Sequence, residues 1–152
     1  MGISQSIFHW AGRVVLERPG RRQSVVDLAS TLRSSGDTVR GRIAAKEGTP
    51  KNVARLRHII GIERWGQQRL RVFLGDPFEP GGHHPHKPIA TDWAALQTEL
   101  AATRADSVAL AGQLGTADLT QTVPHDQFGP LTVRGWLVYI EQHARMESKL
   151  MQ

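Results

Sequence analysis

The chain has 152 residues, a net charge of +5 and no cysteine. This length fits one ordinary domain with a single core, and the missing cysteine excludes a disulfide scaffold, thiolate-bound zinc, an iron–sulfur cluster and a thiol nucleophile carried by the protein. No apolar run reaches about 18 residues and no basic leader precedes an apolar stretch, so the sequence predicts a cytoplasmic protein with no membrane partner.

The N-terminal segment, residues 1–22, is predicted to form a short amphipathic helix ahead of the main domain. Its apolar residues recur at helical spacing between Ile3 and Val15, and Pro19, followed by a glycine, ends the pattern. We expect this segment to dock on the bundle or on a partner. Residues 23–152 are expected to form the domain itself.

Four longer helices are predicted in the remainder of the chain, because apolar residues recur there with a helical period. Their expected ranges are 24–47, 50–74, about 91–114 and 132–152, with N-cap candidates Ser24, Thr49, Thr91 or Asp92, and Thr132. No strand pattern is visible, and the Pro-, Gly- and His-rich stretch 75–91 predicts a long irregular connection. Four such helices with one long connection predict an all-α four-helix bundle.

Two residues able to bind a metal lie on the apolar face of the last predicted helix. His143 and Glu147 are four residues apart, so they project from the same side. His58 interrupts an apolar stretch of the second long helix. Bundles build metal sites from facing helices, and two imidazoles with one carboxylate suit zinc, Fe(II) or nickel. The alternative is three ordinary surface or core residues, since spacing alone does not show that the helices face each other.

Further polar residues are weaker candidates for the same chemistry. A rival metal cluster in the long connection consists of His83, His84 and His86. Such loop histidines are more typical of solvent-exposed side chains, although His86 suits the mouth of a site. His125 and Asp126 precede the last helix and could support a ligand or contact a substrate. Glu63 lies on a different helical face from His58, which predicts a surface position.

The stretch Arg55–Arg64 and the block Phe128–Leu137, followed by His143 and Glu147, resemble the DinB-like superfamily of bacterial metal-binding four-helix bundles. The resemblance implies an up-down-down-up bundle, often a homodimer. It also implies a divalent metal held by one histidine of the second bundle helix and by a His-x-x-x-His pair of the last. His58 and His143 match two of these positions. Glu147 stands where a further histidine is commonest, which shifts the preference towards harder metals.

The resemblance covers roughly Ser24 to the C-terminus and also implies a class of activity. Some relatives are transferases that use bacillithiol or mycothiol, including a mycothiol-dependent maleylpyruvate isomerase, while many have no assigned activity. A chain without cysteine would have to take such a thiol from a small molecule. We therefore expect a metal-dependent S-transferase or hydrolase acting on a small-molecule substrate. The sequence does not distinguish Zn, Ni, Fe and Mn.

Two other classes of function stay open at this point. A basic nucleic-acid-binding protein would use the excess of arginine over lysine, but the arginines are scattered and no recognition-helix or zinc-finger motif occurs. Nucleic acid is therefore not the expected partner. A non-catalytic helical bundle with a decayed site would also account for the departure at Glu147.

Overall fold

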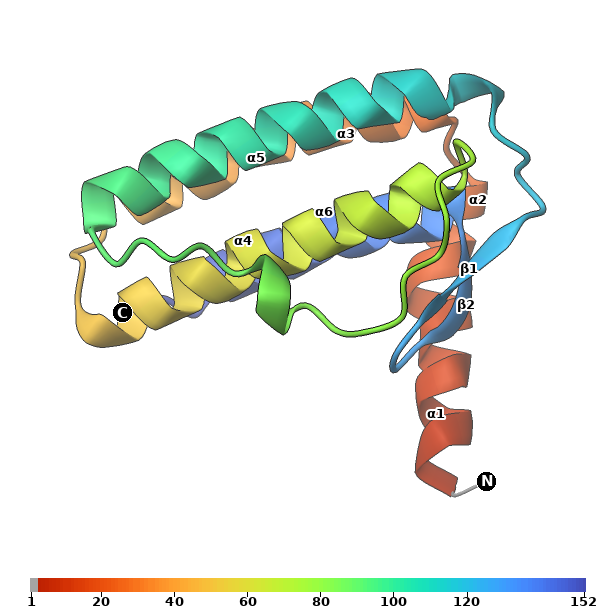
Figure 1. Ribbon diagram of the computed structural model, residues 1–152, viewed down its shortest axis with the longest axis horizontal. Helices are drawn as coiled ribbons and strands as arrows, with labels where there is room; N and C mark the ends of the chain where they lie inside the picture. Colours follow the sequence, from red (N-terminus) through yellow and green to blue (C-terminus); the bar gives the residue numbers. More distant parts are fainter. Residues whose placement is uncertain (1–2) are drawn as a thin grey trace.

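The protein is an all-α bundle with a small β-hairpin and an additional N-terminal helix, as the computed structural model of residues 3–152 shows (Figure 1). Residues 1 and 2 of the predicted N-terminal segment lie outside the described residues. The bundle consists of α3 (Val25–Ala44), α4 (Pro50–Val72), α5 (Trp93–Gln113) and α6 (Val133–Lys149). The predicted fold class is confirmed.

The bundle has the up-down-down-up order that the resemblance implies. Both α3 and α4 pack against α5 and also against α6. Following the colours in Figure 1, α3 and α6 run in one direction and α4 and α5 in the other. Because α4 and α5 run in the same direction, the chain between them returns along the length of the bundle. The long connection is therefore the crossover that this topology requires.

Each bundle helix begins where a polar side chain accepts a hydrogen bond from a backbone amide two or three positions into the helix. The caps are Ser24 (from Asp27 N, 3.0 Å), Thr49 (from Asn52 N, 3.2 Å), Asp92 (from Ala95 N, 2.8 Å) and Thr132 (from Gly135 N, 3.2 Å). All four predicted starts are confirmed, and Asp92 is the cap of α5 rather than the neighbouring threonine.

The expectation that the chain lacks strands is wrong at one place. An antiparallel hairpin of β1 (Thr122–His125) and β2 (Gly129–Thr132) precedes α6, with Thr122 paired to Thr132. Each strand has only four residues and each contains a proline, so neither shows the alternation that identifies a strand in sequence. The long connection also contains one short 3₁₀ turn, η2 (His84–His86), where no regular structure was expected.

The N-terminal segment is helical and docks on the bundle. It consists of α1 (Ile3–Ala11), a π-helical turn η1 (Gly12–Glu17) and α2 (Arg18–Arg21). The buried carboxylate of Glu17 accepts hydrogen bonds from the Thr132 amide (2.7 Å) and hydroxyl (3.0 Å) at the start of α6. This contact ties the segment to the first turn of α6. The domain boundary at residues 22 and 23 stays a prediction.

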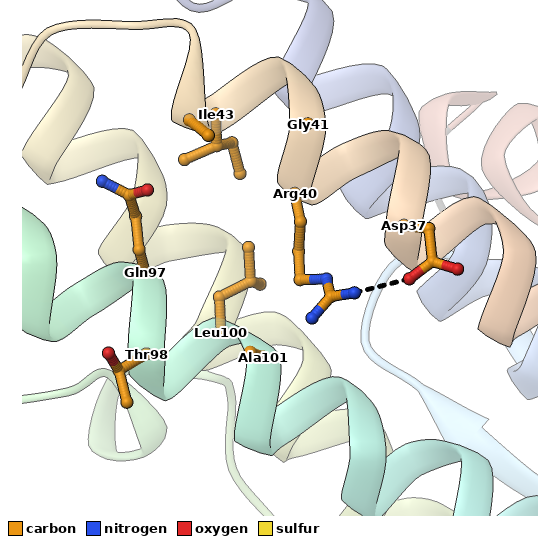
Figure 2. Close-up of a pocket in the computed structure, with 9 residues that line it drawn as sticks. Asp37, Arg40, Gly41, Ile43, Gln97, Thr98, Leu100 and Ala101 are labelled. Carbon is orange, nitrogen blue, oxygen red and sulfur yellow. Dashed lines mark hydrogen bonds and ion pairs between the residues drawn. The ribbon is translucent and has the colours of Figure 1, made fainter.

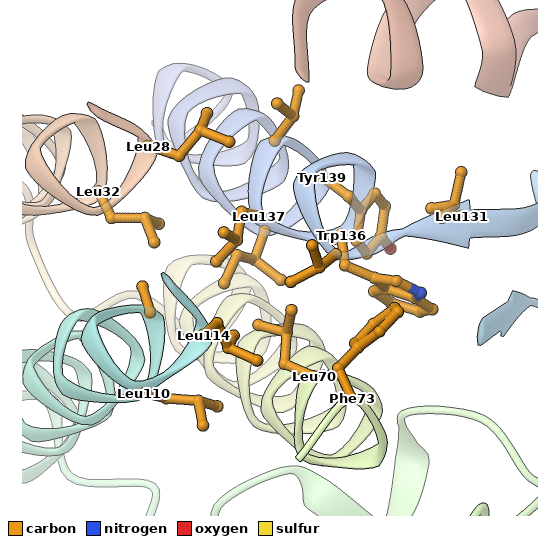
Figure 3. Close-up of a cluster of buried hydrophobic side chains, with 14 of the residues drawn as sticks. Leu28, Leu32, Leu70, Phe73, Leu110, Leu114, Leu131, Trp136, Leu137 and Tyr139 are labelled. Atoms are coloured by element: carbon orange, nitrogen blue, oxygen red, sulfur yellow. The ribbon is translucent and has the colours of Figure 1, made fainter. Parts of the chain in front are cut away.

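The core has two parts along the bundle axis. The larger part lies at the hairpin end, where Figure 3 shows Leu28 and Leu32 of α3 facing Leu137 of α6, while Trp136 of α6 lies beside Phe73. The second part lies towards the opposite end and includes Val39, Ile43, Leu56, Ile60, Leu96 and Leu100. Among the described residues, no helix has the length and apolar character needed to cross a membrane.

The predicted surface position of Glu63 is wrong. Its side chain is 1% exposed and accepts hydrogen bonds from Arg104 Nε (2.7 Å), Arg104 Nη2 (2.9 Å) and Ser107 Oγ (2.7 Å). The remaining guanidinium nitrogen of Arg104 donates to the carbonyl of Leu32 (3.0 Å) and to Ser35 Oγ (3.2 Å). A buried carboxylate is tolerated because every charge in this group has a partner. The sequence pattern did not reveal that Arg104 faces it.

Candidate metal centre

Three side chains from two helices meet between α4 and α6. The Nε2 atoms of His58 and His143 are 3.2 Å apart, and one ligand atom each of His58, His143 and Glu147 lie within 4.8 Å of one another. Two nitrogens bound to one tetrahedral zinc ion at the usual bond length would be about 3.3 Å apart. The observed separation therefore fits two ligands of one ion. It also fits a simple hydrogen bond between the two rings.

Burial keeps both imidazoles of this cluster neutral. Desolvation lowers the pKa of His58 below its usual value of 6.5, and it lowers the pKa of His143 to about 3. For His143, the nearby His58 ring adds to the decrease. A neutral imidazole has a free lone pair, which is the form that binds a metal. The Nδ1 atom of His143 is buried without a hydrogen-bond partner.

Glu147 is fixed by an ion pair across the two helices. Its Oε2 accepts a hydrogen bond from Arg55 Nη1, and both side chains are 24% exposed. Arg55 comes from the same face of α4 as His58, one turn earlier, so the two helices supply the imidazoles and the paired carboxylate at the same level. The set of two neutral imidazoles and one carboxylate fits a divalent cation, because zinc and Fe(II) both accept these ligands.

The cluster opens into a largely apolar pocket of about 660 Å³. His58 and His143 line it together with the aromatic side chains of Trp65, Phe128 and Tyr139. The N-terminal segment contributes part of its wall through Ala11, Val15 and Leu16. Pockets of this size that are mostly apolar, with a few convergent polar groups, are typical of sites for small molecules.

The structure places the other predicted residues at different distances from this cluster. His125 and Asp126 line the pocket, whereas His86 is not among its lining residues. His125 is 5% exposed, and its Nδ1 accepts hydrogen bonds from the amides of Gln127 (3.1 Å) and Phe128 (3.2 Å). The neutral ring therefore carries its proton on Nε2, which is buried and has no partner. Desolvation, followed by the charge of Arg69, lowers the pKa of His125 to about 4.

Sequence reasoning missed one residue beside the cluster, Tyr139, and named another, His83, only as part of a separate loop cluster. Tyr139 lies one turn before His143 on the same face of α6, so helical spacing alone could have identified it. The His83 ring lies 4.9 Å from the His58 ring, centroid to centroid. No periodic signal could have selected His83 from its neighbours, because it belongs to the irregular connection.

A second hollow of about 510 Å³ lies between α3 and α5, on a different side of the bundle (Figure 2). Its floor includes Ile43 and Leu100, and its charged groups are Asp37 and Arg40, which bind each other at 2.6 Å. No histidine lines it. Its charges satisfy each other and it offers no metal-ligand set, so the cluster at His58 is the stronger candidate site.

Comparison with known proteins identifies the family of this bundle. The family model of the DinB superfamily matches residues 18–147. The match begins at α2, so α1 and η1 lie outside it, and it ends at Glu147, the last member of the cluster. No curated protein and no solved structure matches the chain.

Proposed function

Because the chain belongs to the DinB superfamily, we propose that it binds one divalent metal ion through His58, His143 and Glu147 and acts as a metal-dependent enzyme on a small molecule. One observation carries this proposal. Two neutral imidazole nitrogens 3.2 Å apart, with a carboxylate beside them, face a pocket large enough for a substrate. The ligands come from two helices of a bundle whose packing holds them in place.

A bound ion would supply one kind of chemistry, namely a lowered pKa for a bound water or external thiol. The chain supplies the rest. Arg55 orients the Glu147 carboxylate, while the aromatic side chains of Trp65 and Phe128 give the pocket an apolar wall. The Tyr139 hydroxyl is protonated and can donate a hydrogen bond at neutral pH, and burial raises its pKa further.

The proposed reactions are S-transfer from a thiol of the bacillithiol or mycothiol type, or hydrolysis. S-transfer needs a thiol that the protein does not itself contain, since the chain has no cysteine, and hydrolysis needs only water. The apolar pocket favours a substrate with a substantial apolar part. Zn, Ni, Fe and Mn are all candidates for the ion, and a carboxylate in the ligand set suits the harder members of that group.

The proposal includes a cytoplasmic homodimer. The side chains of Ile7, Phe8 and Trp10 on α1 are 58%, 47% and 65% exposed, which offers an apolar surface for a second copy. Light scattering of the purified chain should give twice the monomer mass of 16.8 kDa. A Trp10→Ser variant should shift the mass towards the monomer at low concentration. A monomeric wild type would remove the dimer from the proposal and leave the metal site standing.

Metal analysis tests the central proposal. The untagged protein, purified without chelator and incubated with Zn²⁺, Ni²⁺, Fe²⁺ or Mn²⁺ in turn, should retain one ion per chain after desalting. His58→Ala and His143→Ala should lose it, whereas His9→Ala should keep it, because His9 is an exposed residue of α1 outside the cluster. A wild type that retains none of the four metals would refute the proposal. It would favour the non-catalytic bundle.

The basic nucleic-acid-binding alternative has its own readout. Binding of duplex DNA that weakens steeply with salt would support it. Part of the arginine excess is used within the fold, because Arg55, Arg64 and Arg104 form ion pairs with glutamates. We therefore expect no detectable duplex binding even at low salt.

A further inference from the structure

The crossover connection runs along the outside of α4 (Figure 1), and its residue His83 approaches the candidate metal centre, with its ring centroid 4.9 Å from that of His58. Two side chains of α4 hold it there. Arg69 donates hydrogen bonds to the carbonyls of Glu79 and Gly81, the second at 2.6 Å, and Trp65 Nε1 donates to the Gly81 carbonyl at 3.0 Å. Although this part of the chain is rich in proline and glycine, its backbone is bound to the helix at a defined point.

Arg69 is an unusual residue to use as a loop clamp, because its side chain is 0% exposed. Its guanidinium lies 4.5 Å from the Phe78 ring and 5.2 Å from the Trp65 ring. A buried cation needs partners, and here they are two loop carbonyls and two aromatic faces. The contacts with the connection offset part of the cost of burying this charge, so they favour the connection staying on α4.

Further along, the connection is held a second time. Arg57 Nε donates to the carbonyl of Pro88 at 2.9 Å, and a β-carbon at Gly61 would lie 2.7 Å from Lys87 Cγ, so the connection approaches the α4 backbone closely. The residues between Gly81 and Lys87 are thus fixed at both ends. They include the three loop histidines, of which His83 and His84 line the pocket and His86 does not.

Two other imidazole rings lie at nearly equal distances from the His58 ring. Its centroid lies 4.9 Å from that of His83 and 5.0 Å from that of His143. Two imidazoles bound to one tetrahedral ion at the usual metal–nitrogen length have ring centroids about 5 Å apart. The His58–His83 centroid spacing therefore suits two ligands of one ion. The ligand atoms that already lie within 4.8 Å of one another are those of His58, His143 and Glu147, so the connection has to bring the His83 ring closer to the ion.

We propose that His83 is a fourth protein ligand of the ion held by His58, His143 and Glu147. This inference rests on the proposed function. It makes the donor set three imidazoles and one carboxylate, and it places the loop histidine in the position that an open site leaves for water or substrate. A substrate or thiol must then displace His83 or expand the coordination. The crossover connection thereby becomes a closing element of the pocket.

The neighbouring loop histidines provide matched controls. The His84 ring stacks on the His83 ring, with ring centroids 4.6 Å apart and an interplanar angle of 24°. The His84 side chain itself is exposed. His86 does not line the pocket. Replacing His84 or His86 removes a histidine from the same loop and leaves the proposed ligand, His83, in place.

Zinc K-edge X-ray absorption of the Zn²⁺-loaded protein counts imidazole ligands directly. We expect three in the wild type, two in His83→Ala and three in His84→Ala and His86→Ala. Competition with a chelator should show Zn²⁺ affinity at least about tenfold weaker for His83→Ala, the range typical when a group that supports a metal site is lost. The His83→Gln variant, which keeps a polar side chain on the loop, repeats the test should the alanine variant not fold.

The outcomes separate the two proposals. A wild type that binds no Zn²⁺ and no other tested metal overturns the metal site, and with it this inference. A wild type that binds Zn²⁺ with two imidazoles, or a His83→Ala variant with unchanged affinity, overturns the role of His83 alone. Three imidazoles in the wild type and a loss confined to the His83 variants support it.

Discussion

Two glutamate–arginine ion pairs of the bundle differ in burial and in how completely their surroundings are hydrogen-bonded. Glu63 and Arg104 are 1% and 6% exposed, and every nitrogen and oxygen of the pair's charged groups has a protein partner. Glu147 and Arg55 are each 24% exposed and lie beside His143. The buried Nδ1 atom of His143 has no hydrogen-bond partner among the described residues. A satisfied polar cluster fixes helix positions, whereas an incompletely satisfied one retains the capacity to bind something else.

The largest expected effect is on the satisfied pair. Replacing Glu63 with alanine leaves the Arg104 guanidinium buried without its counter-charge, so we expect a loss of about 3–5 kcal/mol in the free energy of unfolding, measured with urea. The double variant Glu63→Leu/Arg104→Met should recover much of that loss, because no uncompensated charge remains. A loss below about 1 kcal/mol for the single variant would show that the pair is not buried as described.

The next effect concerns the unsatisfied cluster. A metal ion that binds only the folded chain, at a free concentration of 100 times its Kd, should raise the free energy of unfolding by about 2.7 kcal/mol. The same addition should leave His143→Ala unchanged, while Glu63→Gln, if folded, should still respond. Calorimetric melts with and without Zn²⁺ measure this difference. Equal responses in wild type and His143→Ala would place the metal elsewhere.

A pH effect of intermediate size is expected from His125. Its pKa is about 4 in the folded protein against 6.5 in an unfolded chain, so the unfolded state takes up the proton first. The stability from this residue is present above pH 6.5 and is lost as the pH falls towards 4. His125→Asn can still accept the amides of the turn but does not titrate. From pH 7 to pH 4, wild type should lose on the order of 2 kcal/mol more than this variant in urea unfolding.

The smallest effect is expected in the hollow between α3 and α5. Arg40 and Asp37 have side chains that are 51% and 66% exposed, so solvent screens their ion pair. Arg40→Ala should change the free energy of unfolding by less than about 1 kcal/mol and leave metal stoichiometry unaltered. A loss of metal in this variant would show that this hollow and the metal cluster are coupled.

Helical periodicity predicted the parts of the fold that depend on local sequence. The four bundle helices, their caps and the buried face of α6 follow from residues that are near one another in the chain. The helical spacing of His143 and Glu147 is of the same kind. Their proximity to His58 depends on how α4 and α6 pack; spacing allowed this arrangement, and the resemblance to a known family favoured it.

The features that sequence reasoning missed depend on contacts between distant segments. Glu63 was expected at the surface because it lies on a different helical face from His58, and its burial depends on Arg104, which is 41 positions away. The hairpin before α6 was missed because four-residue strands carry too little pattern. The approach of His83 to His58 depends on where Arg69 holds the crossover connection, and no local rule describes that.

The hydrogen bonds of Glu17 at the first turn of α6 have an evolutionary consequence. A β-carbon at position 135 would lie 2.1 Å from Glu17 Oε1, so a side chain larger than glycine's is incompatible with the carboxylate in its present place. Position 17 also lies one residue before the stretch shared with the family. Related chains that carry an alanine or larger residue at position 135 are therefore expected to have a shorter residue at 17, and the two positions should covary.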